Sequence, residues 1–211
     1  MLRVGLTGGL ACGKTTVALI LASHGAHVNY ADELARELME PGKPVYDDVV
    51  KHFGADIVDP DGRINRRKLA EKAFGGKRVH ELNALVHPAV IKRETEWMEE
   101  VGAFEPGAIV VIEAALILEA GLGTRFDKIV VVTCSPEQRV ERFAARARIS
   151  LEEARVEVER RMAAQLPDEE KIKVADFVIE NSGAMPELEA KTEQLIAALK
   201  SWNLTGVGKG L

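Results

Sequence analysis

The sequence of 211 residues contains few cysteines, no excess of positive charge and no long apolar run. Its two cysteines, Cys12 and Cys134, lack zinc-site spacing, and such a low number favours a reducing compartment over a disulfide scaffold. A net charge of −5 argues against nucleic acid as the main partner, because that binding needs a strongly basic surface. No apolar run reaches the length that spans a membrane. We therefore expect a cytoplasmic protein without a membrane or nucleic-acid partner, and the oligomeric state stays open.

The chain does have enough apolar material for a core, since 46% of its residues are hydrophobic. Short apolar runs alternate with long charged segments of helical period, a pattern that predicts an α/β fold with a parallel sheet between helices. The runs AIVVIE and DKIVVVTC lack polar alternation, as expected for strands buried on both faces. The expected strands are residues 2–6, 26–30, 108–113, 128–133 and 176–180.

A glycine-rich motif directly follows the first expected strand. Residues 5 to 16 read GLTGGLACGKTT, with the spacing Gly-x-x-x-x-Gly-Lys-Thr of a P-loop, the phosphate-binding loop of many nucleotide-binding proteins. Its glycines permit positive φ, and its amides with the next helix N-terminus form a cradle for an anion. Lys14 is expected to reach the β- and γ-phosphates of ATP, and the Thr15 hydroxyl to bind Mg²⁺. The alternative is an ordinary glycine turn before a helix. The expected nucleotide-binding residues are Gly9, Leu10, Ala11, Cys12, Gly13, Lys14, Thr15 and Thr16.

Two carboxylates stand at or just after the ends of expected strands. Asp32 comes two residues after Tyr30, and Glu113 ends the strand AIVVIE. Ligands of open α/β sheets bind at the carboxyl edge, so we expect Asp32 to orient or deprotonate an attacking hydroxyl and Glu113 to help hold Mg²⁺. The alternatives are a helix N-cap for Asp32 and a solvated strand end for Glu113.

The segment 136–173 is charged and rich in arginine. Arg142 and Arg146 lie four residues apart, so on a helix their guanidinium groups could converge on a transferred phosphoryl group. We interpret the segment as a lid that excludes water from the phosphates. The alternative is a solvated helix with ion pairs, because glutamates alternate with the arginines. The arginines are Arg139, Arg142, Arg146, Arg148, Arg155, Arg160 and Arg161.

Another long segment, 32–107, exceeds the length of a simple crossover between strands. It is mostly helical in pattern, and His87-Pro88 predicts the start of a helix that runs through Trp97. The tail after Trp202 is expected to fray. The predicted organisation is a P-loop core of residues 1–31, 108–135 and 174–211, a helical acceptor-binding insertion at 32–107 and an arginine-rich lid at 136–173.

Together these stretches resemble the dephospho-CoA kinase family over nearly the full length of the chain. VGLTGGLACGKTT (4–16) is similar to the family's strand and phosphate loop, and EAALILEAGL (113–122) occupies the place of its aspartate and proline-leucine run. Three positions depart from the family pattern: Tyr30 and Glu113 stand where aspartate is usual, and Arg139 where glutamine is frequent. The remaining similar stretches are YADELARELMEPGKPVYDDVVKHFG (30–54), GRINRRKLAEKAF (62–74), LNALVHPAVI (82–91) and RMAAQLPDEEKIKVADFVIENSG (161–183).

The resemblance implies ATP-dependent phosphorylation of the ribose 3′-hydroxyl of dephospho-CoA, which yields coenzyme A and ADP in the last step of coenzyme A synthesis. In that reaction Asp32 would face the acceptor hydroxyl, Lys14 and Mg²⁺ would span the β- and γ-phosphates, and the pair Arg142 and Arg146 would stabilise the transferred group. The expected acceptor contacts, with a structural role as the alternative for His87, are Arg66, Arg67, Lys68 and His87.

Other functions of a phosphate loop stay open beside this one. They are a different small-molecule kinase, a nucleotide switch that regulates a partner, and a binding module without activity. The sequence has no guanine-specifying Asn-Lys-x-Asp motif, which counts against a GTPase. The joint presence of Lys14, Thr15 and Asp32 counts against an inactive binding module.

Overall fold

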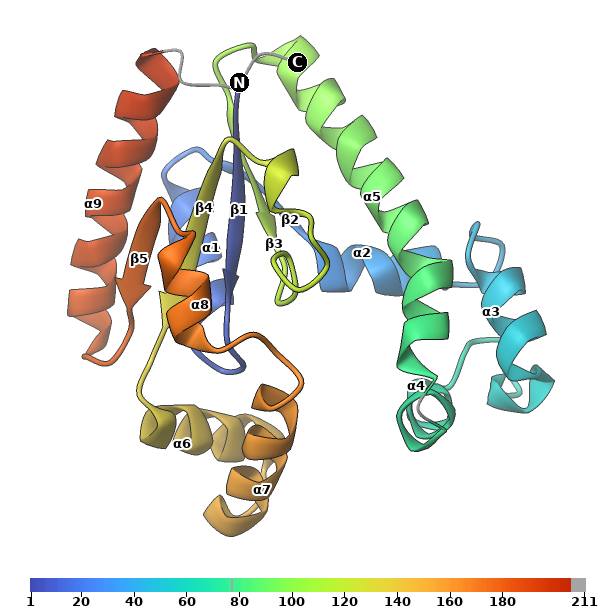
Figure 1. The fold of residues 1–211 in the computed structure, drawn as a ribbon. Helices are drawn as coiled ribbons and strands as arrows, with labels where there is room; N and C mark the ends of the chain where they lie inside the picture. The colour runs from blue at the N-terminus through green and yellow to red at the C-terminus, as the bar shows by residue number, and fades with distance from the viewer. Residues whose placement is uncertain (77, 206–211) are drawn as a thin grey trace. The chain divides into compact units, whose positions relative to one another are not determined.

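The computed structural model describes residues 1–76 and 78–205 (Figure 1). Within these residues the strands are β1 (Leu2–Gly8), β2 (His27–Tyr30), β3 (Ile109–Glu113), β4 (Lys128–Thr133) and β5 (Phe177–Glu180). The α-helices are α1 (Lys14–Ser23), α2 (Ala31–Leu38), α3 (Tyr46–Phe53), α4 (Arg66–Ala70), α5 (Val79–Phe104), α6 (Pro136–Ala147), α7 (Leu151–Met162), α8 (Asp168–Lys173) and α9 (Met185–Leu204). Short helical turns are η1 (Ala55–Ile57), η2 (Glu71–Gly75) and η3 (Gly123–Arg125).

The strands form one five-stranded sheet in the order β2-β3-β1-β4-β5. Strand β1 pairs in parallel with β3 and β4, and β4 pairs in parallel with β5. The middle of the sheet is apolar on both faces: Val110 and Val111, whose side chains point to opposite faces, are both fully buried. The predicted α/β fold with a parallel sheet is therefore confirmed.

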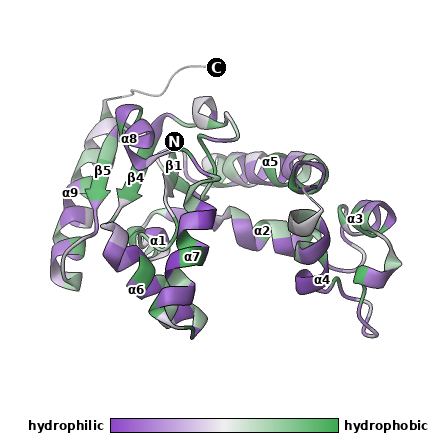
Figure 2. Cartoon of the chain, turned by 60° about the horizontal axis from the view of Figure 1, so that its bottom comes forward, coloured by the Kyte–Doolittle hydropathy of each residue, from purple (hydrophilic) through white to green (hydrophobic). Residues whose placement is uncertain are grey.

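Helices cover both faces of this sheet. Helices α1 and α9 contact each other, and both contact β1 and β3. In Figure 1, α8 lies in front of β4, which it contacts, while α1 lies behind the sheet. In Figure 2, strands β4 and β5 are green and therefore apolar. Helices α6 and α7 show both green and purple, as expected for helices with one solvent-exposed face. None of the described helices is both long enough and apolar enough to span a membrane.

The chain divides into two compact units. The first unit contains the sheet and comprises Met1–Asn29 and the residues from Glu100 onward. The second unit, Tyr30–Glu99, is helical and has an apolar core of its own. The buried members of that core are Leu34, Leu38, Val45, Val49, Phe53, Ile57, Leu69, Ala73, Val86 and Val90.

The start predicted for a helix at His87-Pro88 is wrong, because α5 already begins at Val79 and contains Pro88 in its interior. Proline lacks the N–H that would bond to the carbonyl of Ala84. Both Ala84 and Pro88 are exposed, so water can satisfy that carbonyl. A buried stripe at four-residue spacing continues through the proline and favours one long helix: Val86, Val90, Glu94 and Met98.

The predicted fraying after Trp202 is wrong for Asn203 and Leu204, which complete α9. The Asn203 side-chain amide donates to the carbonyl oxygen of Gly107 at 2.6 Å and so ties this end of the helix to the sheet. The rest of the predicted tail, apart from Thr205, lies outside the described residues.

Candidate active site

The phosphate-loop motif forms a sharp turn between β1 and α1. Gly8, Ala11 and Gly13 have φ values of 145°, 56° and 95°, in the region where glycine is favoured. A Cβ atom on Gly8 would collide with the backbone carbonyl of Val132 in β4, and one on Gly13 would collide with the side chain of Asn181. The motif therefore needs glycine at these positions for both conformation and space. Helix α1 begins at Lys14, so its first amides face the loop.

The Lys14 side chain folds back over the loop. Its Nζ donates to the carbonyl oxygens of Gly8 and Gly9, each at 3.1 Å. These partners are neutral, so the ammonium group has no carboxylate to neutralise it among the described residues. A phosphate group in the loop would supply the counter-charge that Lys14 lacks.

Thr15, the second residue of α1, contacts Glu113 at the carboxyl end of β3. Leu6 of β1 is in register with Glu113 of β3, which places the Glu113 carboxylate beside the start of α1. The Thr15 Oγ1 hydroxyl donates to Glu113 Oε2 at 3.4 Å. The described residues form no group of three or more histidine, cysteine or acidic side chains that could hold a metal. A hydroxyl and one carboxylate fit Mg²⁺, which keeps few protein ligands and shares its shell with phosphates and water.

The two arginines that the sequence pairs, Arg142 and Arg146, have different contacts. Arg142 is half-buried, and its Nη2 donates to Asn181 Oδ1 at 3.4 Å. Its Nη1 is buried without a hydrogen-bond partner among the described residues. Arg146 is exposed, and its guanidinium lies 5.6 Å from the centroid of the Phe143 ring. Of this pair, Arg142 is the one whose side chain has a hydrogen bond, among the described residues, to a residue that contacts the phosphate loop, Asn181.

Two residues outside the predicted site, Arg139 and Asn181, contact the phosphate loop. Arg139, of which 4% is exposed, lies against Gly9, where a Cβ would collide with its guanidinium. Its Nη2 pairs with Asp168 Oδ2 at 2.6 Å. Asn181, just after β5, donates from Nδ2 to the carbonyl oxygen of Cys12 at 2.9 Å. The position of Asn181 at a strand end is the signal that could have identified it.

The loop also packs on an apolar cluster that joins α6 to α7. Leu10 and Ala11 pack against this cluster and are partly buried. Cys12 and Cys134 are both buried, free thiols, and burial raises the pKa of the Cys134 thiol. The buried members of the cluster are Val140, Phe143, Ala144, Ala154 and Val158.

Asp32 belongs to the second unit, where it is the second residue of α2. The N-cap of this helix is Tyr30, which makes no side-chain capping bond, so the alternative of Asp32 as an N-cap is wrong. Asp32 is exposed, and its side chain has no hydrogen bond or ion pair with any described residue. Its carboxylate is available to a ligand, and its catalytic role stays a prediction.

The predicted acceptor contacts also lie in the second unit, and they differ in availability. Arg66 is exposed and unpaired among the described residues, whereas Arg67 lies 3.5 Å from Glu71 and Lys68 lies 3.1 Å from Asp59. His87 is half-buried in α5, and burial lowers the pKa of its imidazole. Of these four side chains, Arg66 is the cation most available to an anionic ligand.

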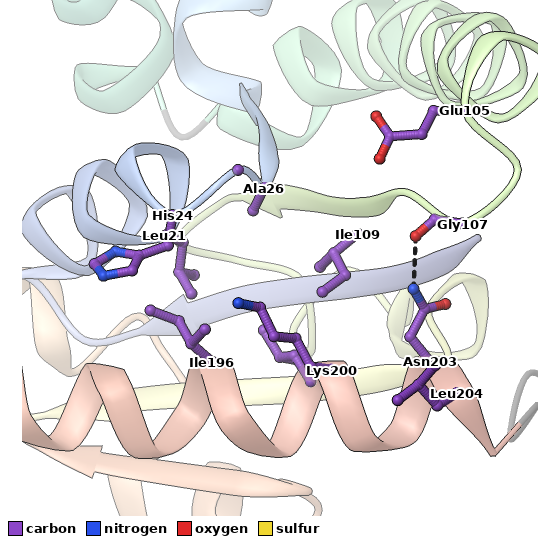
Figure 3. Close-up of a pocket in the computed structure, with 12 residues that line it drawn as sticks. Leu21, His24, Ala26, Glu105, Gly107, Ile109, Ile196, Lys200, Asn203 and Leu204 are labelled. Carbon is purple, nitrogen blue, oxygen red and sulfur yellow. Dashed lines mark hydrogen bonds between the residues drawn. The ribbon is translucent and has the colours of Figure 1, made fainter.

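A cavity of about 370 Å³ lies at the opposite, amino edge of the sheet (Figure 3). Leu21, Ile109 and Ile196 line it with apolar surface, and Lys200 and Asn203 reach it from α9. None of the predicted site residues lines this cavity. The candidate active site is therefore the phosphate loop with its neighbours, at the carboxyl edge.

The chain matches a family model described as dephospho-CoA kinase over residues 2–187. It is 38% identical over 203 residues to the dephospho-CoA kinase of Corynebacterium glutamicum, covering 95% of this chain and 98% of that protein. Over 200 residues it is 40% identical to the dephospho-CoA kinase of Corynebacterium efficiens, covering 94% and 98% of the two chains.

Solved structures agree with this similarity. A Thermus thermophilus crystal structure superposes with a TM-score of 0.75 at 35% identity, covering 94% of this chain and 97% of that one. A dephospho-CoA kinase from Campylobacter jejuni, 22% identical, shares the fold with a TM-score of 0.68, covering 95% and 98% of the two chains. Because the family model and the curated relatives match almost the full length, this chain belongs to the dephospho-CoA kinase family.

Proposed function

We propose that this kinase transfers the γ-phosphoryl group of ATP to the ribose 3′-hydroxyl of dephospho-CoA, with coenzyme A and ADP as products. The observation that supports this most is the loop around Lys14, with Thr15 beside Glu113, in a chain similar over almost its full length to curated dephospho-CoA kinases. The proposal requires little covalent chemistry from the protein, since phosphoryl transfer depends mainly on positioning and charge neutralisation.

The residues of the first unit would hold the nucleotide. The loop amides from Gly9 to Thr16 bind the phosphates, and the Lys14 ammonium neutralises charge on the β- and γ-phosphates. Thr15 and Glu113 would hold Mg²⁺, the Glu113 carboxylate directly or through water. When bound, Mg²⁺ supplies positive charge to the phosphate oxygens. Arg142 stabilises charge on the transferred group, and Arg146 would have to leave Phe143 to do the same.

The second unit would bind the acceptor. Asp32 orients or deprotonates the acceptor hydroxyl, a role that its free and exposed carboxylate permits. Arg66 has no competing partner among the described residues, while Arg67 and Lys68 would have to release Glu71 and Asp59 to contact an anionic acceptor. His87 would contact the acceptor as a neutral imidazole, because burial lowers its pKa.

We further propose that segment 136–173 acts as the lid and that the enzyme works in the cytoplasm.

The test is release of ADP from ATP and Mg²⁺ with dephospho-CoA, adenosine, AMP, CMP or no acceptor. We expect dephospho-CoA to give the highest kcat/KM by a wide margin. Faster turnover of AMP or a nucleoside would assign the enzyme to a different small-molecule kinase activity. Equal ADP release without any acceptor would indicate a nucleotide switch or ATPase.

A further inference from the structure

Asn181 occupies the turn that follows β5, at the edge of the sheet where the phosphate loop opens. Its backbone N–H donates to the carbonyl oxygen of Thr133 at 2.8 Å and extends the pairing of β4 with β5 by one residue. Only 6% of the residue is exposed. A polar side chain buried this deeply needs partners for both ends of its amide.

The amine end of the Asn181 side chain holds the phosphate loop. Nδ2 donates to the buried carbonyl oxygen of Cys12 at 2.9 Å, and the same amide occupies the space that a Cβ on Gly13 would need. Asn181 thereby determines the position of the Cys12 carbonyl immediately before Gly13 and Lys14. The amides that follow this peptide are those expected to bind phosphate.

The carbonyl end of the same side chain faces Arg142. Oδ1 accepts from Arg142 Nη2 at 3.4 Å, while Arg142 Nη1 is buried with no partner among the described residues. A guanidinium can only donate and a backbone carbonyl can only accept, so the two contacts determine the orientation of the Asn181 amide. Asparagine satisfies both contacts, and aspartate cannot, because its carboxylate has no donor.

We infer that Asn181 is a positioning residue that couples the phosphate loop to Arg142. It holds the Cys12–Gly13 peptide in the conformation that receives phosphate, and it brings the Arg142 guanidinium to the same place. This role rests on the proposed phosphoryl transfer and assigns to Asn181 no direct contact with the substrate. Arg146, which lies on Phe143, is outside this coupling.

The first test is binding of ADP, measured by calorimetry without an acceptor. N181D removes the donor to Cys12 and adds negative charge next to the cradle, so we expect affinity to fall about 10- to 100-fold. The matched control is N203D, because Asn203 also donates to a backbone carbonyl, at the opposite edge of the sheet (Figure 3). We expect N203D to bind ADP within about twofold of the wild type.

The second test is a double-mutant cycle in kcat. If Asn181 acts partly through Arg142, the combined effect of N181A and R142A on kcat should be smaller than the product of their single effects, whereas the effects of N181A and R146A should multiply. Multiplicative effects in both pairs would overturn the coupling. Circular dichroism checks that each variant is folded, and N181S replaces N181D or N181A if either is unfolded.

Wild-type affinity of N181D for ADP, or an equal loss in N203D, would overturn the role of Asn181 at the loop. Failure of the proposed function looks different. In that case the wild-type protein does not use dephospho-CoA, yet the ADP-binding difference between N181D and N203D persists, since that measurement needs no acceptor.

Discussion

Lys14 is the one positively charged residue of the phosphate-loop motif. Its Nζ donates hydrogen bonds to the carbonyl oxygens of Gly8 and Gly9, and it has no anionic partner among the described residues. Replacing it with alanine removes the positive charge from the β- and γ-phosphates, so we expect K14A to lower kcat about 100-fold or more.

K200A is the control for K14A, because Lys200 is exposed, has no partner among the described residues and lines the cavity at the far edge of the sheet. Turnover by K200A should equal that of the wild type. Near-normal turnover by folded K14A would disprove the catalytic role of the loop lysine.

Asp32 can be tested with an equally sharp comparison. D32N keeps the size of the side chain and removes its charge, and a general base lost in this way lowers kcat about 100- to 10,000-fold. Affinity for ADP should stay unchanged, because the loop of the first unit holds the nucleotide. The assay is steady-state phosphorylation of dephospho-CoA together with ADP calorimetry.

D47N is the matched control, since Asp47 is likewise the exposed second residue of a helix, α3. Any effect of a carboxylate on the helix dipole, about 0.3–1 kcal/mol, is therefore shared by both variants. If D32N keeps turnover within a few-fold of D47N, Asp32 is not the base.

Helices α6 and α8 are joined by a largely buried ion pair, whose arginine lies beside Gly9 of the phosphate loop. Arg139 and Asp168 lie 2.6 Å apart, with side-chain exposures of 5% and 21%. D168N leaves the guanidinium without its charged partner, so we expect it to lower the free energy of unfolding by about 3 kcal/mol. The double variant R139Q/D168N removes both charges and should recover most of that loss.

An exposed ion pair of α7 is the comparison within the same segment. Glu157 accepts from Arg160 and Arg161, which lower the pKa of its carboxyl to about 2. Because both arginines are largely solvated, E157Q should cost less than about 1 kcal/mol at neutral pH. Denaturant unfolding measures both variants, and a D168N loss no larger than that of E157Q would contradict the buried-pair assignment.

The chain divides into two units with separate cores, so damage to one core should affect the two substrates unequally. Phe53 is buried in the core of the second unit. F53A should lower stability by about 3–5 kcal/mol and raise KM for dephospho-CoA more than Kd for ADP. Leu195, fully buried in α9 of the first unit, provides the opposite case, and L195A should weaken ADP binding at least as much as acceptor use. Equal effects of F53A on both ligands would contradict this division.

Local sequence patterns determined the succession of strands and helices along the chain, the turn of the phosphate loop and the membership of the family. These features depend on neighbouring residues: glycines permit the φ angles of the loop, and unbroken apolar runs suit strands covered on both faces. The helix through Pro88 departed from the local pattern because its buried stripe extends beyond the residues around the proline.

Contacts between distant residues were decided by the tertiary structure. Asn181 and Cys12 are 169 residues apart in the chain, and they meet because β5, β4 and β1 are successive strands of the sheet. The same strand order brings Arg142 to Asn181, whereas Arg146 on the same helix makes a local contact with Phe143, three residues before it. Sequence spacing places side chains on a face of a helix, but the element packed against that face determines which of them reaches the loop.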